Sequence, residues 1–255
     1  MTHDHLPLSL RLGALYMRLR DILYVSYRLP VDVLRPLVPA RLPLAQAGEG
    51  GLLSIVVFRC AGVRPALLPF PGLTYNQVNL RTYVKHPGTG EHGVYFIRSA
   101  VTSAAVAAGV RLARLNWEQA ELVLRTERNG RSCYKSYTLG GDWEGEAYVR
   151  AEEVAPQTEA TPPLEDTPQL ASFITHVLLG FYGTEARLLR QRVWHPPLAP
   201  RPARVSSLRL APLAGLGVLS EAEMERPHNV LLVPQAPFWA LPPRRLWPSL
   251  GTSAY

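Results

Sequence analysis

The chain has few of the residues on which several common chemistries depend. Among its 255 residues are two cysteines, Cys60 and Cys133, and two lysines, Lys85 and Lys135. The cysteines form no Cys-x-x-Cys pair, so we expect buried, reduced thiols of a cytosolic protein rather than a disulfide framework. The other basic residues are arginines, which bind carboxylates and phosphates through a planar fork but do not act as amines.

Signals for membrane insertion, export and nucleic-acid binding are also missing. No apolar run approaches the roughly 18–20 residues needed to cross a bilayer. The N-terminal "MTHDHLPLSL" lacks the basic segment and apolar run of a signal peptide. The formal net charge is +7, but the basic residues are scattered singly rather than gathered in a patch. We therefore expect a cytoplasmic protein with neither a membrane nor a nucleic acid as partner.

Recognised catalytic and cofactor motifs are absent as well. No His, Asp and Glu residues recur at a known metal-ligand spacing, and the "HDH" of residues 3–5 lies at a terminus that we expect to be disordered. There is no Gly-x-Ser-x-Gly elbow and no phosphate-binding glycine loop. Ordinary serine hydrolases and nucleotide-dependent enzymes lose support, and we expect no metal and no cofactor.

Strand signals are numerous. A hydrophobic fraction of 47% with 18% charged residues is typical of a globular protein. Asn129-Gly130, between two alternating segments, indicates a β-hairpin. Residues 155–168 predict a surface loop between two halves, and residues 242–255 predict an irregular tail. Helices are expected at 31–39, 100–113 and 168–182, and strands at 21–29, 51–63, 75–85, 94–99, 186–195, 202–210 and 229–233. The sum is an α+β fold, mostly antiparallel.

One predicted strand has an unusual face. In "YNQVNLRTYV" (75–84) the residues Tyr75, Gln77, Asn79, Arg81 and Tyr83 are interleaved with a set that includes Val78, Leu80 and Val84. Alternate side chains of a strand point to opposite sides, so these five share one polar and aromatic surface. That surface either faces solvent or lines an internal cavity. If the antiparallel sheet curls and closes on itself so that no strand edge is exposed, it encloses an interior, and the polar surface is then expected to line a cavity.

Two further residues are candidates for acid–base chemistry. Glu118 follows Trp117 in "RLNWEQA". It is either an exposed acid at the start of a strand or, if enclosed beside the indole, a carboxyl whose pKa rises as a general acid requires. His195, in "VWHPPL", is either a structural hydrogen-bonding residue or a base.

Several stretches in a fixed order carry a family resemblance. They include "RDILYVSYRLPVDVLRPLVPARLPL" (20–44), "GVRLARLNWEQAEL" (109–122) and "VWHPPLAPRPARV" (193–205), and the set covers roughly residues 15 to 245. In this order the chain resembles the uncharacterised YqjF-like family, a branch of the acetoacetate decarboxylase-like superfamily. The resemblance implies a single domain over 1–255, a cone-shaped closed β-barrel with about three peripheral helices and a central cavity. It favours the cavity for the polar face of the strand at 75–85.

The resemblance also indicates that the decarboxylase chemistry is lost. Arg20 falls on an arginine that helps hold the substrate. Gln77 stands where a glutamate lines the site, and a second glutamate falls near Val56. The Schiff-base lysine and its lysine neighbour fall on Trp117 and Glu118. An imine requires a partly deprotonated amine at the centre of the cavity, so we expect no imine-forming decarboxylation.

Two main hypotheses remain. The first is a pocket for a small oxo- or hydroxy-acid, by analogy with the superfamily, with Glu118 and then His195 as the residues for any catalysis. The second is a non-catalytic binding or scaffold protein whose cavity is filled by its own side chains. The oligomeric state stays open, a homo-oligomer included. The expected substrate-binding residues are Arg20, Gln77, Asn79, Arg81 and Trp117.

Overall fold

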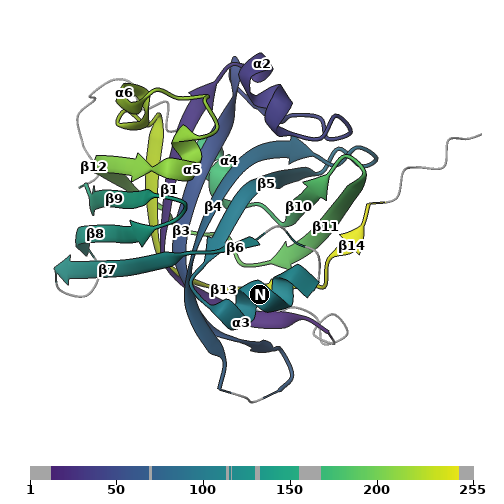
Figure 1. The fold of residues 1–255 in the computed structure, drawn as a ribbon, viewed down its shortest axis with the longest axis horizontal. Coiled ribbons are helices and arrows are strands. Elements are labelled where there is room, and N and C mark those ends of the chain that lie inside the picture. Colours follow the sequence, from purple (N-terminus) through teal and green to yellow (C-terminus); the bar gives the residue numbers. More distant parts are fainter. Residues whose placement is uncertain are drawn as a thin grey trace, which may run out of the picture.

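The computed structural model describes residues 13–68, 71–112, 115, 117–129, 133–154 and 168–246. The "HDH" segment, the Gly130 turn, most of the predicted loop at 155–168 and the end of the predicted tail lie outside these residues. Within them the strands pair mostly antiparallel, and a few short helices lie around them (Figure 1). The mostly antiparallel α+β class expected from the sequence is confirmed.

Seven strands pair in sequence around a common interior. Their order is β11-β10-β5-β4-β3-β1-β13, and β13 pairs again with β11 through Val193–Ala240 and Trp194–Trp239. The pairing thus runs in a ring, with β10 parallel to β5 and the other pairs of the ring antiparallel. The strands are β1 (Leu15–Leu29), β3 (Gly50–Pro65), β4 (Leu73–Lys85), β5 (His92–Val101), β10 (Leu179–Thr184), β11 (Arg187–Trp194) and β13 (Asn229–Ala240).

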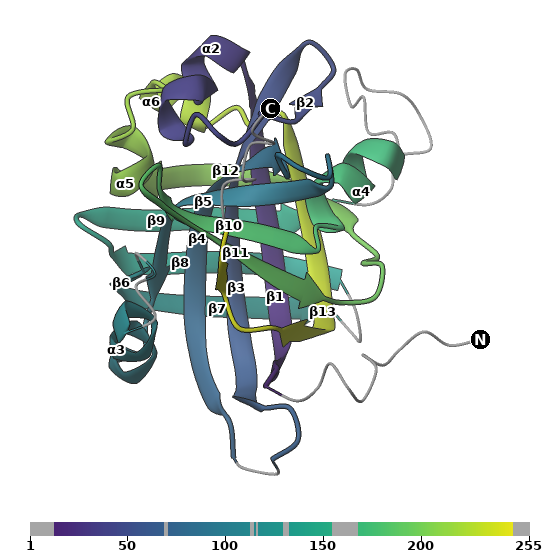
Figure 2. The ribbon, with the colours of Figure 1, turned by 90° about the vertical axis from the view of Figure 1, so that its right-hand side faces the viewer.

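A second layer of four strands packs on one side of this ring (Figures 1 and 2). It consists of β7 (Glu121–Asn129), β8 (Cys133–Asp142), β9 (Glu146–Glu153) and β12 (Arg201–Leu210), and β12 also pairs with β13. The hairpin predicted around Asn129 is confirmed by the pairing of β7 with β8. The large buried side chains between the layers include Tyr134, Tyr137 and Leu139 from β8 against Leu23 and Val25 of β1.

Each predicted helix exists but is shorter than expected. The first covers α2 (Val31–Leu34) and the 3-10 turn Arg35–Leu37, the second is α3 (Ala104–Leu112), and the third is α4 (Pro168–Thr175). Two further short helices, α5 (Ala211–Ala214) and α6 (Glu221–Met224), were not predicted. No helix in the described ranges is long and apolar enough to cross a membrane.

The predictions for residues 176–182 and for one cysteine were wrong. Residues 179–184 form β10 instead of continuing α4, because they pair with β11 on one side and β5 on the other. Gly180 allows β10 to lie close to the Phe96 side chain of β5, since a Cβ at this position would lie 2.8 Å from the Phe96 ring. Cys60 is buried as expected, but Cys133 is exposed at the start of β8. Three short strands complete the sheet: β2 (Gln46–Ala47), β6 (Trp117–Gln119) and β14 (Arg244–Arg245).

A bulge in β1 decides which of its side chains face the interior. Asp21 has a φ of 53°, in the left-handed region that few non-glycine residues adopt. The register of β1 against β3 shifts between Arg20 and Leu23, which means that β1 has an extra residue at this point. An extra residue in one strand moves every side chain beyond it to the opposite face of the sheet. The interior-facing side chains are therefore Leu15, Met17 and Leu19 before the bulge, and Ile22 and Tyr24 after it.

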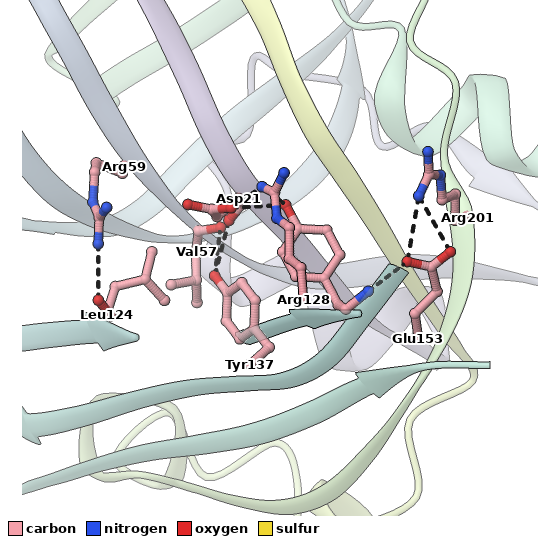
Figure 3. A network of polar contacts seen from close by, with 9 residues as sticks. Asp21, Val57, Arg59, Leu124, Arg128, Tyr137, Glu153 and Arg201 are labelled. Carbon is pink, nitrogen blue, oxygen red and sulfur yellow. Dashed lines mark hydrogen bonds and ion pairs between the residues drawn. The ribbon is translucent and has the colours of Figure 1, made fainter. Parts of the chain in front are cut away.

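The second layer holds this bulge in place through a buried polar network (Figure 3). The Asp21 carboxylate accepts hydrogen bonds from the Arg128 guanidinium and, at 2.7 Å, from the Tyr134 hydroxyl. The Tyr137 hydroxyl lies 3.0 Å from the Asp21 carbonyl oxygen and 3.2 Å from that of Val57. Because Asp21 is buried, these hydrogen bonds are needed to stabilise its carboxylate charge and its left-handed backbone conformation.

Candidate functional site

A cavity of about 540 Å³ occupies the interior of the ring. This is within the range of about 300–1,000 Å³ usual for small-molecule sites. Its walls come from the ring strands, from α3 and from Trp117 of β6, with Thr175 and Val177 closing the end next to α4. Along β4 the lining runs from Leu73 to Arg81, a length of about 27 Å at the usual rise of a strand.

The polar face of β4 lines this cavity. Gln77 and Asn79 are each 4% exposed and Arg81 is 9% exposed, so the solvent-facing interpretation of this strand does not hold. The Gln77 Nε2 donates to Asn79 Oδ1 at 2.8 Å, and the Cys60 thiol lies 3.9 Å from Gln77 Oε1. Burial raises the pKa of Cys60 to about 12, which keeps this thiol protonated and a poor nucleophile.

Arg81 is a buried cation without an acidic partner among the described residues. Its Nη2 donates to the Ile174 carbonyl oxygen at 2.8 Å, and its Nε is buried without a hydrogen-bond partner. The guanidinium carbon lies 5.4 Å from the Tyr24 ring centre and 5.5 Å from that of Tyr83. A guanidinium taken out of water in this way is stabilised by an anion that can accept from its free N–H groups.

Trp117 contributes a second unpaired donor to the same interior. It lines the cavity, and its Nε1 is buried without a hydrogen-bond partner. The pairing places Asn79 opposite Ser99, and Ser99 opposite Trp117. Val56 lies opposite Asn79 on the other side, so these four residues form one row across β3, β4, β5 and β6.

His195 lies in the cavity wall and is 2% exposed. Its Nδ1 is 2.8 Å from the Pro196 carbonyl oxygen, its Nε2 is 3.4 Å from that of Val177, and its ring stacks on Phe238. Burial lowers the pKa of His195, and the charge of Arg81 acts in the same direction. The imidazole is therefore neutral at pH 7, with one nitrogen protonated and the other free to accept a proton.

Two predicted site residues lie away from the cavity. Arg20 is exposed and is not among the lining residues, because it precedes the bulge and points to the opposite side from Leu19. Glu118 pairs with Arg98 through contacts of 3.0 and 2.6 Å and also accepts a hydrogen bond from Trp143 Nε1. It is not among the cavity-lining residues either. The structure thus brings together Gln77, Asn79, Arg81, Trp117 and His195.

Several lining residues were not singled out from the sequence. Tyr24 lies beside Arg81, and burial raises its pKa to about 12 while the Arg81 charge opposes the shift. Tyr182 also lines the cavity, and burial raises its pKa too. Tyr24 occurs in an alternating strand, which could have marked it as inward-facing, whereas Tyr182 falls in a segment predicted to be helical. No group of three or more His, Cys, Asp or Glu side chains able to hold a metal occurs in the described part of the chain.

Solved structures with this arrangement of strands define the fold. The enduracididine biosynthesis enzyme MppR complexed with pyruvate superposes with a TM-score of 0.60 at 13% identity, covering 92% of this chain and 90% of that one. The acetoacetate decarboxylase of Legionella pneumophila gives a TM-score of 0.59 at 14% identity, with 91% and 87% covered. An acetoacetate decarboxylase-like enzyme of Sphingomonas wittichii RW1 gives 0.59 at 18%, with 97% and 99% covered. The chain has the acetoacetate decarboxylase-like fold.

The family follows from the sequence of the same region. Residues 16–237 match DUF2071, a family described as uncharacterised conserved proteins, and the chain belongs to this family. The expectation of an uncharacterised family is confirmed, and the solved structures agree with the acetoacetate decarboxylase-like fold that the resemblance implied. A comparison with curated proteins finds no match.

Proposed function

We propose that this protein binds a small organic acid in the cavity, with the carboxylate of the ligand paired to Arg81. The observation that carries the proposal is the buried guanidinium, whose Nε lacks a partner and which faces no carboxylate among the described residues. Arginine binds carboxylates through two parallel hydrogen bonds. Gln77 and Asn79 would orient the polar part of the ligand, and Trp117 would donate its free N–H.

The surroundings of Arg81 support a ligand over a filled interior. A protein whose own side chains filled the ring would have little space left, whereas the cavity measures about 540 Å³. We also propose that the ring of paired strands forms the cone-shaped closed barrel expected from the resemblance, since the β11–β13 pairs join its two ends. MppR, which shares the fold, has been solved with pyruvate. That complex supports an organic acid here by analogy alone.

The ligand would be held without an imine. Lys85 and Lys135 are the lysines of the sequence, both are exposed, and neither lines the cavity. Lys85 ends β4 and Lys135 lies on β8, and because both amines are exposed outside the cavity lining, neither is placed to attack a carbonyl group beside Arg81. The absence of an inward lysine supports non-covalent binding.

Calorimetric titration tests the role of Arg81. Wild type should bind short monocarboxylates such as butanoate, and Arg81→Met should bind them about 10–100-fold more weakly, because charge-assisted hydrogen bonds are lost. Arg20→Met is the matched control: it removes an exposed arginine of the same sheet and should leave the affinity unchanged. Equal binding by Arg81→Met and wild type would reject the proposal.

A second candidate function is enolisation of an oxo-acid, favoured by the neutral His195 in the same wall. A carboxylate held at Arg81 would place the carbon next to the carbonyl group of an oxo-acid inside the cavity, where His195 Nε2 could take its proton. The test is exchange of the C3 protons of 2-oxobutanoate in D₂O, followed by NMR. His195→Gln should abolish protein-dependent exchange while binding persists; exchange that is unaltered in this variant contradicts the role.

A further inference from the structure

The cavity is polar at one end and apolar along most of its length. The inward side chains of β4 read Leu73, Tyr75, Gln77, Asn79 and Arg81, so polarity and charge increase toward α4. On β1 the corresponding series begins with Leu15, Met17 and Leu19. A two- or three-carbon acid held at Arg81 would leave the apolar part of this lining uncovered.

The apolar end opens to solvent. Leu15 and Leu73 line the cavity yet are 42% and 49% exposed, which marks the mouth between the ends of β1, β3 and β4. The helix α3 lies at this end, because Val101, just before it, pairs with Gln77, and the Thr102 N–H bonds to the Asn76 carbonyl oxygen. From α3, Val106, Gly109 and Val110 complete the wall (Figure 2 shows α3 beside the lower ends of β3 and β4).

Among the described lining residues, Arg64 is the one arginine at the mouth, and it is engaged elsewhere. The Arg64 guanidinium lies 5.1 Å from the Tyr16 ring centre and donates to the Leu68 carbonyl oxygen at 3.2 Å. Arg64 is also near solvent, where an ion pair contributes little. The carboxylate of a ligand is therefore better held at the deep end, by Arg81, than at the entrance.

We propose that the ligand is an amphiphilic monocarboxylate with a long apolar body, its head on Arg81 and its tail reaching toward Leu15 and Leu73. This inference rests on the proposed function and adds the class of the acid. About 27 Å of lining along β4 separates the two ends, and the aromatic and aliphatic side chains between them match an alkyl or arylalkyl chain. Such a ligand would bury apolar surface and satisfy the guanidinium at the same time.

Calorimetry with straight-chain acids tests the tail. Affinity should rise from butanoate through octanoate to dodecanoate by up to about fourfold for each added methylene, the value for full burial of a CH₂ group, at concentrations below micelle formation. Dodecan-1-ol, which has the same chain without the charge, should bind at least tenfold more weakly than dodecanoate.

A variant of α3 tests the position of the tail. No heavy atom lies within 4 Å of where a Cβ at Gly109 would stand, so the Cβ of Gly109→Phe has room, the variant adds a ring at the mouth, and it replaces a poor helix former. It should weaken dodecanoate binding at least tenfold and leave butanoate binding unchanged. Ala108→Phe is the matched control, since Ala108 is exposed on the same helix and does not line the cavity.

The outcomes separate this inference from the proposed function. Binding of butanoate that depends on Arg81 but does not increase with chain length overturns the inference and leaves the proposed function standing. Equal loss of butanoate and dodecanoate binding in Gly109→Phe also overturns it. Acids of every length binding independently of Arg81 would overturn both.

Discussion

At the scale of single residues, Glu118 is a carboxylate close to the cavity whose hydrogen bonds connect neighbouring strands. Arg98 donates to both of its oxygens, and the indole N–H of Trp143 donates to one of them. Arg98 also pairs with Glu144 at 2.7 Å. These contacts tie β6 to β5 and to the turn after β8, and they favour a structural role for Glu118, next to Trp117 in β6.

We predict that Glu118→Ala lowers the free energy of unfolding by about 2 kcal/mol, because the buried Trp143 N–H loses its acceptor and Arg98 loses its main partner. Urea denaturation measures this. Glu152→Ala is the control: it breaks the exposed pair with Arg204, which should contribute at most about 1 kcal/mol. Binding of butanoate by Glu118→Ala should stay within a few-fold of wild type; abolished binding in the folded variant would return Glu118 to the site.

The sequence was informative where a strand is regular and misleading where it is not. The alternation of β4 correctly grouped Gln77, Asn79 and Arg81 on one face, because this face has a constant period of two through those residues. Arg20 shares the even numbering of Ile22 and Tyr24, yet points away from them. A bulge depends on contacts with strands that are distant in the sequence, so the local pattern around Arg20 did not predict the bulge at Asp21.

At the scale of elements, the β1 bulge and the β7–β8 hairpin depend on each other. Asp21 accepts from Arg128 and from Tyr134, one on each strand of the hairpin. The bulge in turn directs Ile22 and Tyr24 into the cavity. Loosening the hairpin should therefore disturb the ligand site, although none of its described residues lines the cavity.

We predict that Arg128→Met costs about 2–3 kcal/mol of stability, because it leaves the buried Asp21 carboxylate without its cation. Asp21→Asn should cost less, since asparagine tolerates the left-handed conformation and keeps an acceptor for Tyr134. The double variant Asp21→Asn/Arg128→Met should be more stable than Arg128→Met alone. A double-mutant cycle by chemical denaturation measures the coupling, and strictly additive effects would show that the two residues act independently.

The same dependence on distant partners limited the prediction of the helices. The helical spacing at 168–182 was real for Leu170 and Ile174, which are buried in α4. Beyond Thr175 the chain found partners in β5 and β11, and the gain from pairing exceeded a weak helical preference. The short helices α5 and α6 have four residues each, too few to leave a periodic signal.

At the scale of the whole molecule, the ring separates an apolar core on its outer side from the cavity on its inner side. Its outer side, against β7–β9 and β12, is the larger apolar core. Its inner side carries apolar residues together with Gln77, Asn79 and Arg81. The sequence predicted most of the strands that make this division, but it gave no strand for β9 and a helix over most of β10. It did not predict the β11–β13 pairing that joins the ends of the ring, because two pairs between segments about 45 residues apart leave no local trace.

A buried histidine in the cavity wall, His195, makes the stability of this fold depend on pH. Burial lowers the pKa of His195 from 6.5, with His176 and Arg81 adding to the shift, and burial also lowers the pKa of His92, which contacts Tyr83 and Phe173 near the same end. The unfolded chain takes up protons on these histidines near pH 6.5 while the folded chain does not. Unfolding therefore binds protons, and stability falls as the pH drops below about 6.5.

We predict that the free energy of unfolding decreases between pH 7 and pH 5.5 by up to about 1.4 kcal/mol per pH unit for each such histidine. His195→Gln should have a shallower dependence over this range, and His92→Gln/His195→Gln a shallower one still, because glutamine carries no titrating group. Denaturation at pH 7.0, 6.25 and 5.5 measures the slopes. Comparison within each variant removes the effect of the substitution itself on stability. A slope in His195→Gln equal to that of wild type would mean that His195 is protonated equally in the folded and unfolded chain, and would contradict its burial as a neutral base beside Arg81.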